Sequence, residues 1–146
     1  MRQLPLILCA AATISLAACS RSQQASASSE SAAISQIESI PAADQTKYGD
    51  ARKIKNWQNP YLVIRTDSIG LMDLANNEEH HIKPDEIAQA LAKLPSSSWP
   101  YGRVIAVEEP RPPASPIDVA AVRKNRAILA GTLEGMHVLI DWIPAP

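Results

Sequence analysis

Apolar runs alternate with polar and proline-containing stretches between residues 57 and 146, and this pattern predicts four β-strands. The β-rich run 61–67 and the apolar segment 71–74 are joined by Ser-Ile-Gly, which predicts a hairpin. The run 103–109 predicts a buried strand, and 136–143 predicts a last strand that prolines end. The segment 75–81, Ala-Asn-Asn-Glu-Glu-His-His, is expected to be a polar loop.

Helical spacing predicts two helices between these strands. Pro84 begins the first, and its apolar side chains share one face: Ile87, Ala90, Leu91 and Leu94. The second begins with Ser115 as its cap and Pro116 in its first turn, and it runs to about Glu134. Gly135 is typical of a helix C-terminus.

The predicted order is strand, strand, helix, strand, helix, strand. It indicates an α+β fold, with a small four-stranded mixed sheet and both helices packed on one face. The last two strands are joined through a helix, so we expect them to lie parallel. Residues 57–146 are expected to form a single domain.

The first residues have the pattern of a secretory signal. Arg2 precedes an apolar run, Leu4 to Ala18, that is too short to cross a bilayer comfortably. Its end, Leu16-Ala17-Ala18-Cys19, resembles the lipobox of bacterial lipoproteins. The resemblance implies cleavage before Cys19 and acylation of Cys19 with palmitate-like chains, which together hold a protein to a membrane. The alternative is an ordinary signal peptide with a free thiol at Cys19.

Ser20 follows the lipobox where an inner-membrane retention signal would have Asp, which favours the outer membrane, facing the periplasm. Residues 19–56 are rich in Ser, Ala and Gln and contain few large apolar side chains. Such a segment cannot bury enough surface to offset its ordering entropy, so we expect a disordered tether. A transient helix over Ala32–Ile40, with Ile34 and Ile37 on one face, is the competing possibility. The predicted organisation is therefore a signal peptide (1–18), a lipidated tether (19–56) and a domain (57–146).

Net charge and cysteine content argue against several classes of partner and of functional site. The formal net charge is −1, and it becomes −2 without residues 1–18, whose one charged residue is Arg2. This argues against nucleic acid or anionic lipid as the main partner. The chain has two cysteines, of which Cys9 lies in the signal peptide. With Cys19 acylated, neither is left for a disulfide, a metal or a nucleophile.

The pattern of the domain resembles the periplasmic domain of the ExbD/TolR biopolymer-transport family. The matching positions lie at the end of the first strand, the start of the first helix, the third strand and the last helix–strand junction: Asp67 and Gly70, Asp85-Glu86-Ile87, Val104 to Val107, and Gly135 with Val138 to Ile140. The resemblance implies an α/β domain with a partner-binding or cell-wall-facing role. The family's motor function does not carry over, because the chain has no transmembrane helix with a membrane-embedded Asp.

Catalytic and metal-binding patterns are weak. Glu78-Glu79-His80-His81 has metal-ligand residue types, but adjacent side chains diverge, and no HExxH spacing is present. The chain has no G-x-S-x-G elbow around its serines, and its five glycines are scattered. Glu108 and Glu109 are adjacent on a strand and face opposite sides. We therefore expect no enzyme activity, no metal and no cofactor.

Two features are better candidates for partner binding. Arg126 lies beside the apolar stripe of the second helix, either with its stem packed on the core or with its guanidinium directed at an anionic group. Trp99, Tyr101, Arg103 and Arg111 flank the third strand and are of residue types enriched at interface hot spots. The alternative for Trp99 is a cap on the core, and for the loop 110–116 it is ordinary rigidity.

Three functional classes follow. The first is a lipid-anchored, periplasm-facing, non-enzymatic binding or adaptor lipoprotein whose partner is an envelope protein or the cell wall. The second is an inhibitor or immunity lipoprotein that blocks a secreted or periplasmic enzyme through the acidic, proline-rich loop 108–116. The third is an enzyme, for which the sequence offers no assembled set of catalytic residues.

Overall fold

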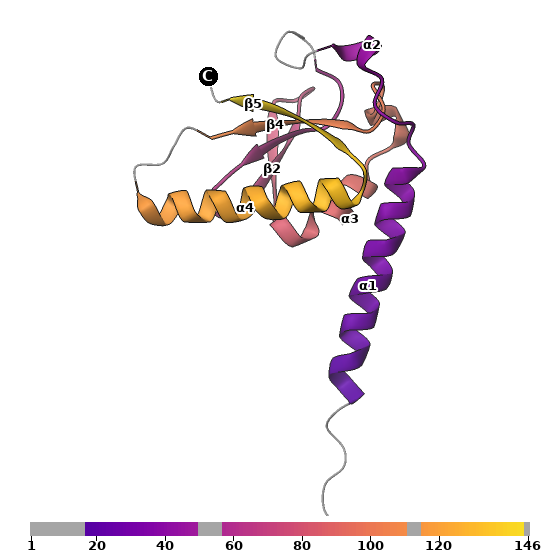
Figure 1. The fold of residues 1–146 in the computed structure, drawn as a ribbon, viewed down its shortest axis with the longest axis vertical. Coiled ribbons are helices and arrows are strands. Elements are labelled where there is room, and N and C mark those ends of the chain that lie inside the picture. Colours follow the sequence, from indigo (N-terminus) through magenta and orange to yellow (C-terminus); the bar gives the residue numbers. More distant parts are fainter. Residues whose placement is uncertain (1–16, 50–56, 111–114, 145–146) are drawn as a thin grey trace, which may run out of the picture.

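A computed structural model of the chain describes residues 17–49, 57–110 and 115–144, and the fold is α+β (Figure 1). The helices are α1 (Ala17–Glu38), α2 (Gln45–Tyr48), α3 (Ile87–Ala92) and α4 (Pro116–Gly135). Two short 3₁₀ turns, η2 (Pro84–Glu86) and η3 (Ser96–Ser98), flank α3. The strands are β1 (Tyr61–Ile64), β2 (Ile69–Asp73), β3 (Glu78–Ile82), β4 (Val104–Glu109) and β5 (Leu139–Pro144).

The five strands form one mixed sheet in the order β3-β2-β1-β4-β5. β1, β2 and β3 are antiparallel neighbours, whereas β4 is parallel to both β1 and β5. The predicted antiparallel pairing of the first two strands and the predicted parallel pairing of the last two are therefore confirmed. The predicted turn at Ser68-Ile69-Gly70 is wrong, because Ile69 and Gly70 belong to β2 and the Arg65 amide donates to the Ser68 carbonyl across the turn. The predicted start of α4 is also confirmed, with Ser115 as its cap residue and Pro116 in its first turn.

The main core lies between one face of the sheet and the helices α1, α3 and α4, which Figure 1 shows together beneath the sheet. Its fully buried side chains include Leu62, Ile64 and Ile105 from the sheet. Leu91 and Leu129 contribute from α3 and α4. The predicted packing of two helices on one face is thus right for α3 and α4, and α1 is a third helix on that face.

A smaller aromatic cluster covers part of the opposite sheet face. The rings of Tyr48, Trp57 and Tyr101 contact one another with centroids 5.3–6.0 Å apart. They pack over Val104 and Ala106 of β4, both of which are fully buried. The short helix α2 supplies Tyr48 to this cluster, so residues before 57 contribute to both faces.

The expectation of four strands is wrong, because the segment 78–82 is the edge strand β3 rather than a polar loop. Its residues, Glu-Glu-His-His-Ile, are mostly exposed and show no apolar alternation. Edge strands commonly carry charged side chains that discourage unwanted pairing, so the hydrophobic signal of a strand is absent there. Pairing with β2, from Asp73↔Glu78 to Ile69↔Ile82, holds β3 in place.

The expectation of a disordered tether is also wrong for the described part of 19–56. Residues 17–38 form α1, and Ala33, Ile37 and Ile40 are buried in the main core. Their spacing of four and three residues places them on one helix face, which packs against α3. The composition of the segment predicted disorder because it reflects only how few apolar residues the segment contains. It carries no information about the apolar surface of α3, against which those residues pack. The folded unit therefore begins before residue 57.

Specific polar contacts also join the N-terminal segment to the domain. Glu38 Oε1 lies 2.8 Å from His137 Nδ1, and Gln89 Nε2 donates to Ser29 Oγ over 3.2 Å. The Arg103 amide donates to the Pro41 carbonyl over 2.9 Å. Gly102 is required beside this contact, since its φ is +79° and an added Cβ would meet the Ala42 carbonyl.

Within the described residues, no helix combines the length and hydropathy needed to cross a membrane.

Candidate functional site

An open groove lies at the end of the sheet where β1 begins. The pairing of β1 with β2 ends at Tyr61↔Met72 although β2 continues to Asp73, and the Pro60 carbonyl accepts the Ala106 amide of β4 over 3.3 Å. The preceding residues 57–60 turn toward β4 instead. This divergence leaves a gap between them and the end of β2.

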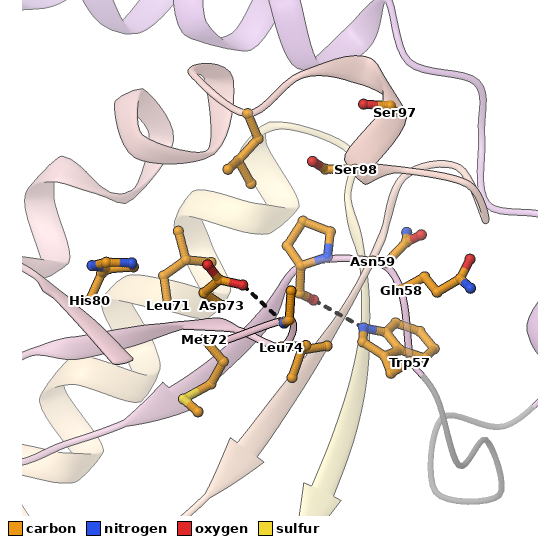
Figure 2. Close-up of a pocket in the computed structure, with 13 residues that line it drawn as sticks. Trp57, Gln58, Asn59, Leu71, Met72, Asp73, Leu74, His80, Ser97 and Ser98 are labelled. Carbon is orange, nitrogen blue, oxygen red and sulfur yellow. Dashed lines mark hydrogen bonds between the residues drawn. The ribbon is translucent and has the colours of Figure 1, made fainter. Parts of the chain in front are cut away.

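Asn59 fixes the diverging segment. Its side-chain Nδ2 donates to the carbonyls of Gly102 and Val104, each over 2.7 Å, and its Oδ1 accepts the Tyr101 amide over 3.0 Å. The residue is 2% exposed, so these bonds are shielded from water. The Trp57 indole N–H donates to the Pro60 carbonyl over 3.2 Å, which closes the turn (Figure 2). The groove is therefore held open by a satisfied buried network.

The groove has a volume of about 650 Å³, within the range of sites that bind small molecules or short segments. Figure 2 shows residues 57–59, the η3 serines and the end of β2 around it. Its lining consists of Trp57, Gln58, Asn59, Pro60, Leu71, Met72, Asp73, Leu74, Ala75, His80, Leu94, Ser97 and Ser98. Leu74 is 45% exposed, one of three large apolar side chains exposed to that degree in the described chain.

Asp73 gives the groove its negative charge. Its carboxylate accepts the Asn76 side-chain amide over 2.8 Å and the Ala75 amide over 3.0 Å, which lowers its pKa. Asp73 also lies opposite Glu78 in the β2–β3 register. No Lys or Arg is among the described residues that line the groove. The site thus combines apolar side chains with a carboxylate whose pKa is lowered.

The structure does not bring the predicted partner-binding residues onto one surface. Trp99 is 3% exposed and belongs to the main core, as in the core-cap alternative. Tyr101 lies in the aromatic cluster on the opposite face, and Arg103 is half-buried with its Nε unpartnered among the described residues. Arg111 falls outside the described residues. Cys19 lies in α1, and its side chain also falls outside the description.

Arg126 directs its guanidinium at a carboxylate, the second of the two arrangements expected for it. Its Nη2 lies 2.8 Å from Glu109 Oε1, and its guanidinium carbon lies 4.6 Å from the centroid of the Trp142 ring. The side chain is 51% exposed, so these contacts hold the cation at the surface without desolvating it. The carboxylate that Arg126 binds thus belongs to the same chain, at Glu109, and not to a ligand.

Sequence reasoning missed one cluster with catalytic residue types, at the turn between β1 and β2. Ser68 Oγ donates to Asp67 Oδ1 over 2.9 Å and lies 3.0 Å from His81 Nδ1. In a hydrolytic triad the serine gives its proton to the histidine. Here the serine proton is directed to Asp67, so the order of donors is reversed. No group of three or more potential metal ligands occurs in the described part of the chain.

The sheet face opposite the main core carries two further polar pairs. Arg65 binds Glu79 through two bonds, of 2.6 and 2.8 Å, and this lowers the pKa of Glu79. Tyr61 donates to Glu108 over 2.7 Å, and burial together with this carboxylate raises the pKa of Tyr61. The Glu79 side chain lies directly over Gly70, where a Cβ on any other residue would overlap with it.

Comparisons with protein families, with curated proteins and with solved structures found no match to this chain. Its function is therefore inferred from its own residues.

Proposed function

We propose that the chain is a lipid-anchored, non-enzymatic binding or adaptor lipoprotein of the bacterial cell envelope. In this proposal Cys19 carries the acyl chains and the domain faces the periplasm, with its anchor in the outer membrane. The observation that carries the binding role is the groove beside Asn59, which has a fixed frame and a mixed apolar and acidic lining.

α1 supports the anchored arrangement. The helix includes Cys19 near its start and reaches the core through Ala33 and Ile37. The residues from 19 to 38 would span about 30 Å at the rise of an α-helix. Figure 1 shows the N-terminal half of α1 extending away from the rest of the domain. A helix of this kind would hold the groove at a defined distance from an acylated Cys19, where a flexible coil would not.

The groups around the groove favour binding over catalysis. The Asn59 amide is fully used in main-chain contacts, and the Asp73 carboxylate stabilises the adjacent turn. Such groups shape a surface and set its charge, and the titratable side chain that shares the groove with Asp73 is His80. The resemblance to the periplasmic ExbD/TolR domain stays a hypothesis within this proposal, as a source of the partner-binding role.

Site-specific photocrosslinking tests the proposal. A benzophenone amino acid at Leu74 is expected to capture a distinct envelope component in living cells, because Leu74 is exposed at the groove. Ile117 is the matched control, since it is 80% exposed on α4 and does not line the groove. Crosslinking at Ile117 but not at Leu74 would refute the groove as the partner site.

The runner-up is an inhibitor or immunity lipoprotein, and the same experiment separates it from the adaptor. An inhibitor that used the loop 108–116 would crosslink to its target from that loop. The half-buried Glu109, at the end of β4, provides a second probe position for this outcome.

A further inference from the structure

The groove has features that select a class of ligand. It is open along one side, so it suits a segment of a longer molecule better than an enclosed small molecule. Pairing with β1 ends at Met72, and the main chain of Asp73 faces its partner Glu78 in β3; among the described residues, the next residue at this end of β2, Leu74, has no strand partner on the β1 side. An extended peptide can pair with such an end through its main chain, while its side chains occupy neighbouring pockets.

The charge of the groove gives a second criterion for its ligand. The Asp73 carboxylate accepts hydrogen bonds from the Asn76 side chain and from the Ala75 and Asn76 amides, which lower its pKa. Glu78 lies directly across from it on the same face of the sheet, and like charges in that position repel each other. A cation placed between the two carboxylates would relieve this repulsion, whereas a phosphate or carboxylate would add to it.

The apolar side chains give a third criterion. Leu71, Leu74 and Leu94 line the groove, and Leu74 is nearly half exposed in the free protein. An aliphatic side chain of a ligand would cover this surface. Ser97 and Ser98 on the facing turn η3 offer hydroxyl groups to a peptide main chain.

We propose that the groove binds an extended segment of a partner protein in which a Lys or Arg residue is adjacent to an aliphatic residue. This inference rests on the proposed function and specifies its partner chemistry. The cation occupies the side of the groove near Asp73 and Glu78, and the aliphatic side chain packs beside Leu74.

Two peptide probes test the inference. Acetyl-Ala-Leu-Lys-Leu-Ala-amide and its counterpart with Glu in place of Lys are titrated into the mature chain carrying Cys19→Ser, followed by amide NMR shifts. The Lys peptide is expected to shift signals of the groove residues and to bind at least about tenfold more tightly than the Glu peptide. Equal binding of the two peptides, or no binding by either, overturns the inference.

Two pairs of variants locate the effect. Asp73→Asn removes the charge but keeps an acceptor for the turn, and it is expected to weaken the Lys peptide about threefold to fivefold. Asp85→Asn makes the same charge change on η2, outside the groove, and is expected to leave the affinity unchanged. Leu74→Ser is expected to weaken the peptide, whereas Ile117→Ser is not. Equal effects within either pair contradict the proposed binding mode.

A non-ionic probe with an alkyl chain, decyl maltoside, distinguishes a lipid-binding groove. If it shifts the groove signals while the Lys peptide does not, the peptide assignment is wrong. Photocrosslinking at Leu74 can still succeed in that case, so failure of the ligand class is distinguishable from failure of the proposed function.

Discussion

Ile37→Ala is the most direct test of how the N-terminal segment relates to the domain. Ile37 is 1% exposed and lies in the main core, on the face of α1 that packs against α3. Truncating a buried isoleucine to alanine removes its transfer free energy and leaves a cavity, which together cost about 2–5 kcal/mol. The same change in a disordered tether would cost nothing. Against a typical stability of about 5–15 kcal/mol, the expected loss is large.

The assay is urea and thermal unfolding of residues 19–146 carrying Cys19→Ser. Ile37→Ala is expected to lower the melting temperature by roughly 8 °C or more. Ile37→Val should give a smaller loss of about 0.5–1.5 kcal/mol, and it keeps the test valid if the alanine variant does not fold. Gln36→Ala is the matched control, because Gln36 is exposed on the same helix turn. Equal stability of all three variants and the parent would refute the packing of α1 on the core.

Cys19→Ser is expected to abolish labelling by a palmitate analogue and partitioning with membranes, because the acyl chains are the strong anchor in the proposal; equal labelling of variant and parent would rule out lipidation at this residue. Trp99→Ala should cost about 3–5 kcal/mol in urea unfolding, since Trp99 is buried. Arg126→Ala should cost less than about 1 kcal/mol in the same assay, since its side chain is half exposed; a reversed order would contradict the assigned burial. The pKa of Glu79 is lowered by Arg65, so this pair stabilises the fold at neutral pH and its contribution is lost as the pH falls below about 4. Arg65→Ala should therefore reduce the acid-dependent loss of stability in unfolding measured across that range, and an unchanged pH profile would argue against the pair.

The central elements could be predicted from the sequence because local and tertiary preferences agree there. Within the run 103–109, residues 104–107 are apolar on both faces, as β4 requires between β1 and β5. Ser115 and Pro116 mark the start of the second helix by backbone geometry, and α4 begins there; Gly135 is its last residue, but the positive φ after the helix is at His137. The parallel pairing of β4 and β5 follows from the helix between them.

The remaining features depend on contacts between distant parts of the chain. α1 is stabilised by α3, which lies about 50 residues later, and the composition of 19–56 contains no trace of that surface. β3 is an edge strand with mostly charged and polar side chains, so its pairing with β2 could not be recognised from the sequence. The groove requires the Asn59 side chain to reach carbonyls 43 and 45 residues away, which no local pattern encodes. Trp99 and Tyr101 are close in sequence, but they contribute to different clusters, one on each face of the sheet.

Cys19 and the groove are linked in the fold through one short segment. α1 packs against α3, where Gln89 contacts Ser29, and the chain after α3 supplies Leu94, Ser97 and Ser98 to the groove. Ala33 and Ile37 of α1 and Leu91 of α3 belong to the same buried cluster. The wall of the groove and the helix that begins beside Cys19 therefore share a packed core. A lipidated Cys19 would thus fix the distance of the groove from the membrane and also, through α1, its orientation.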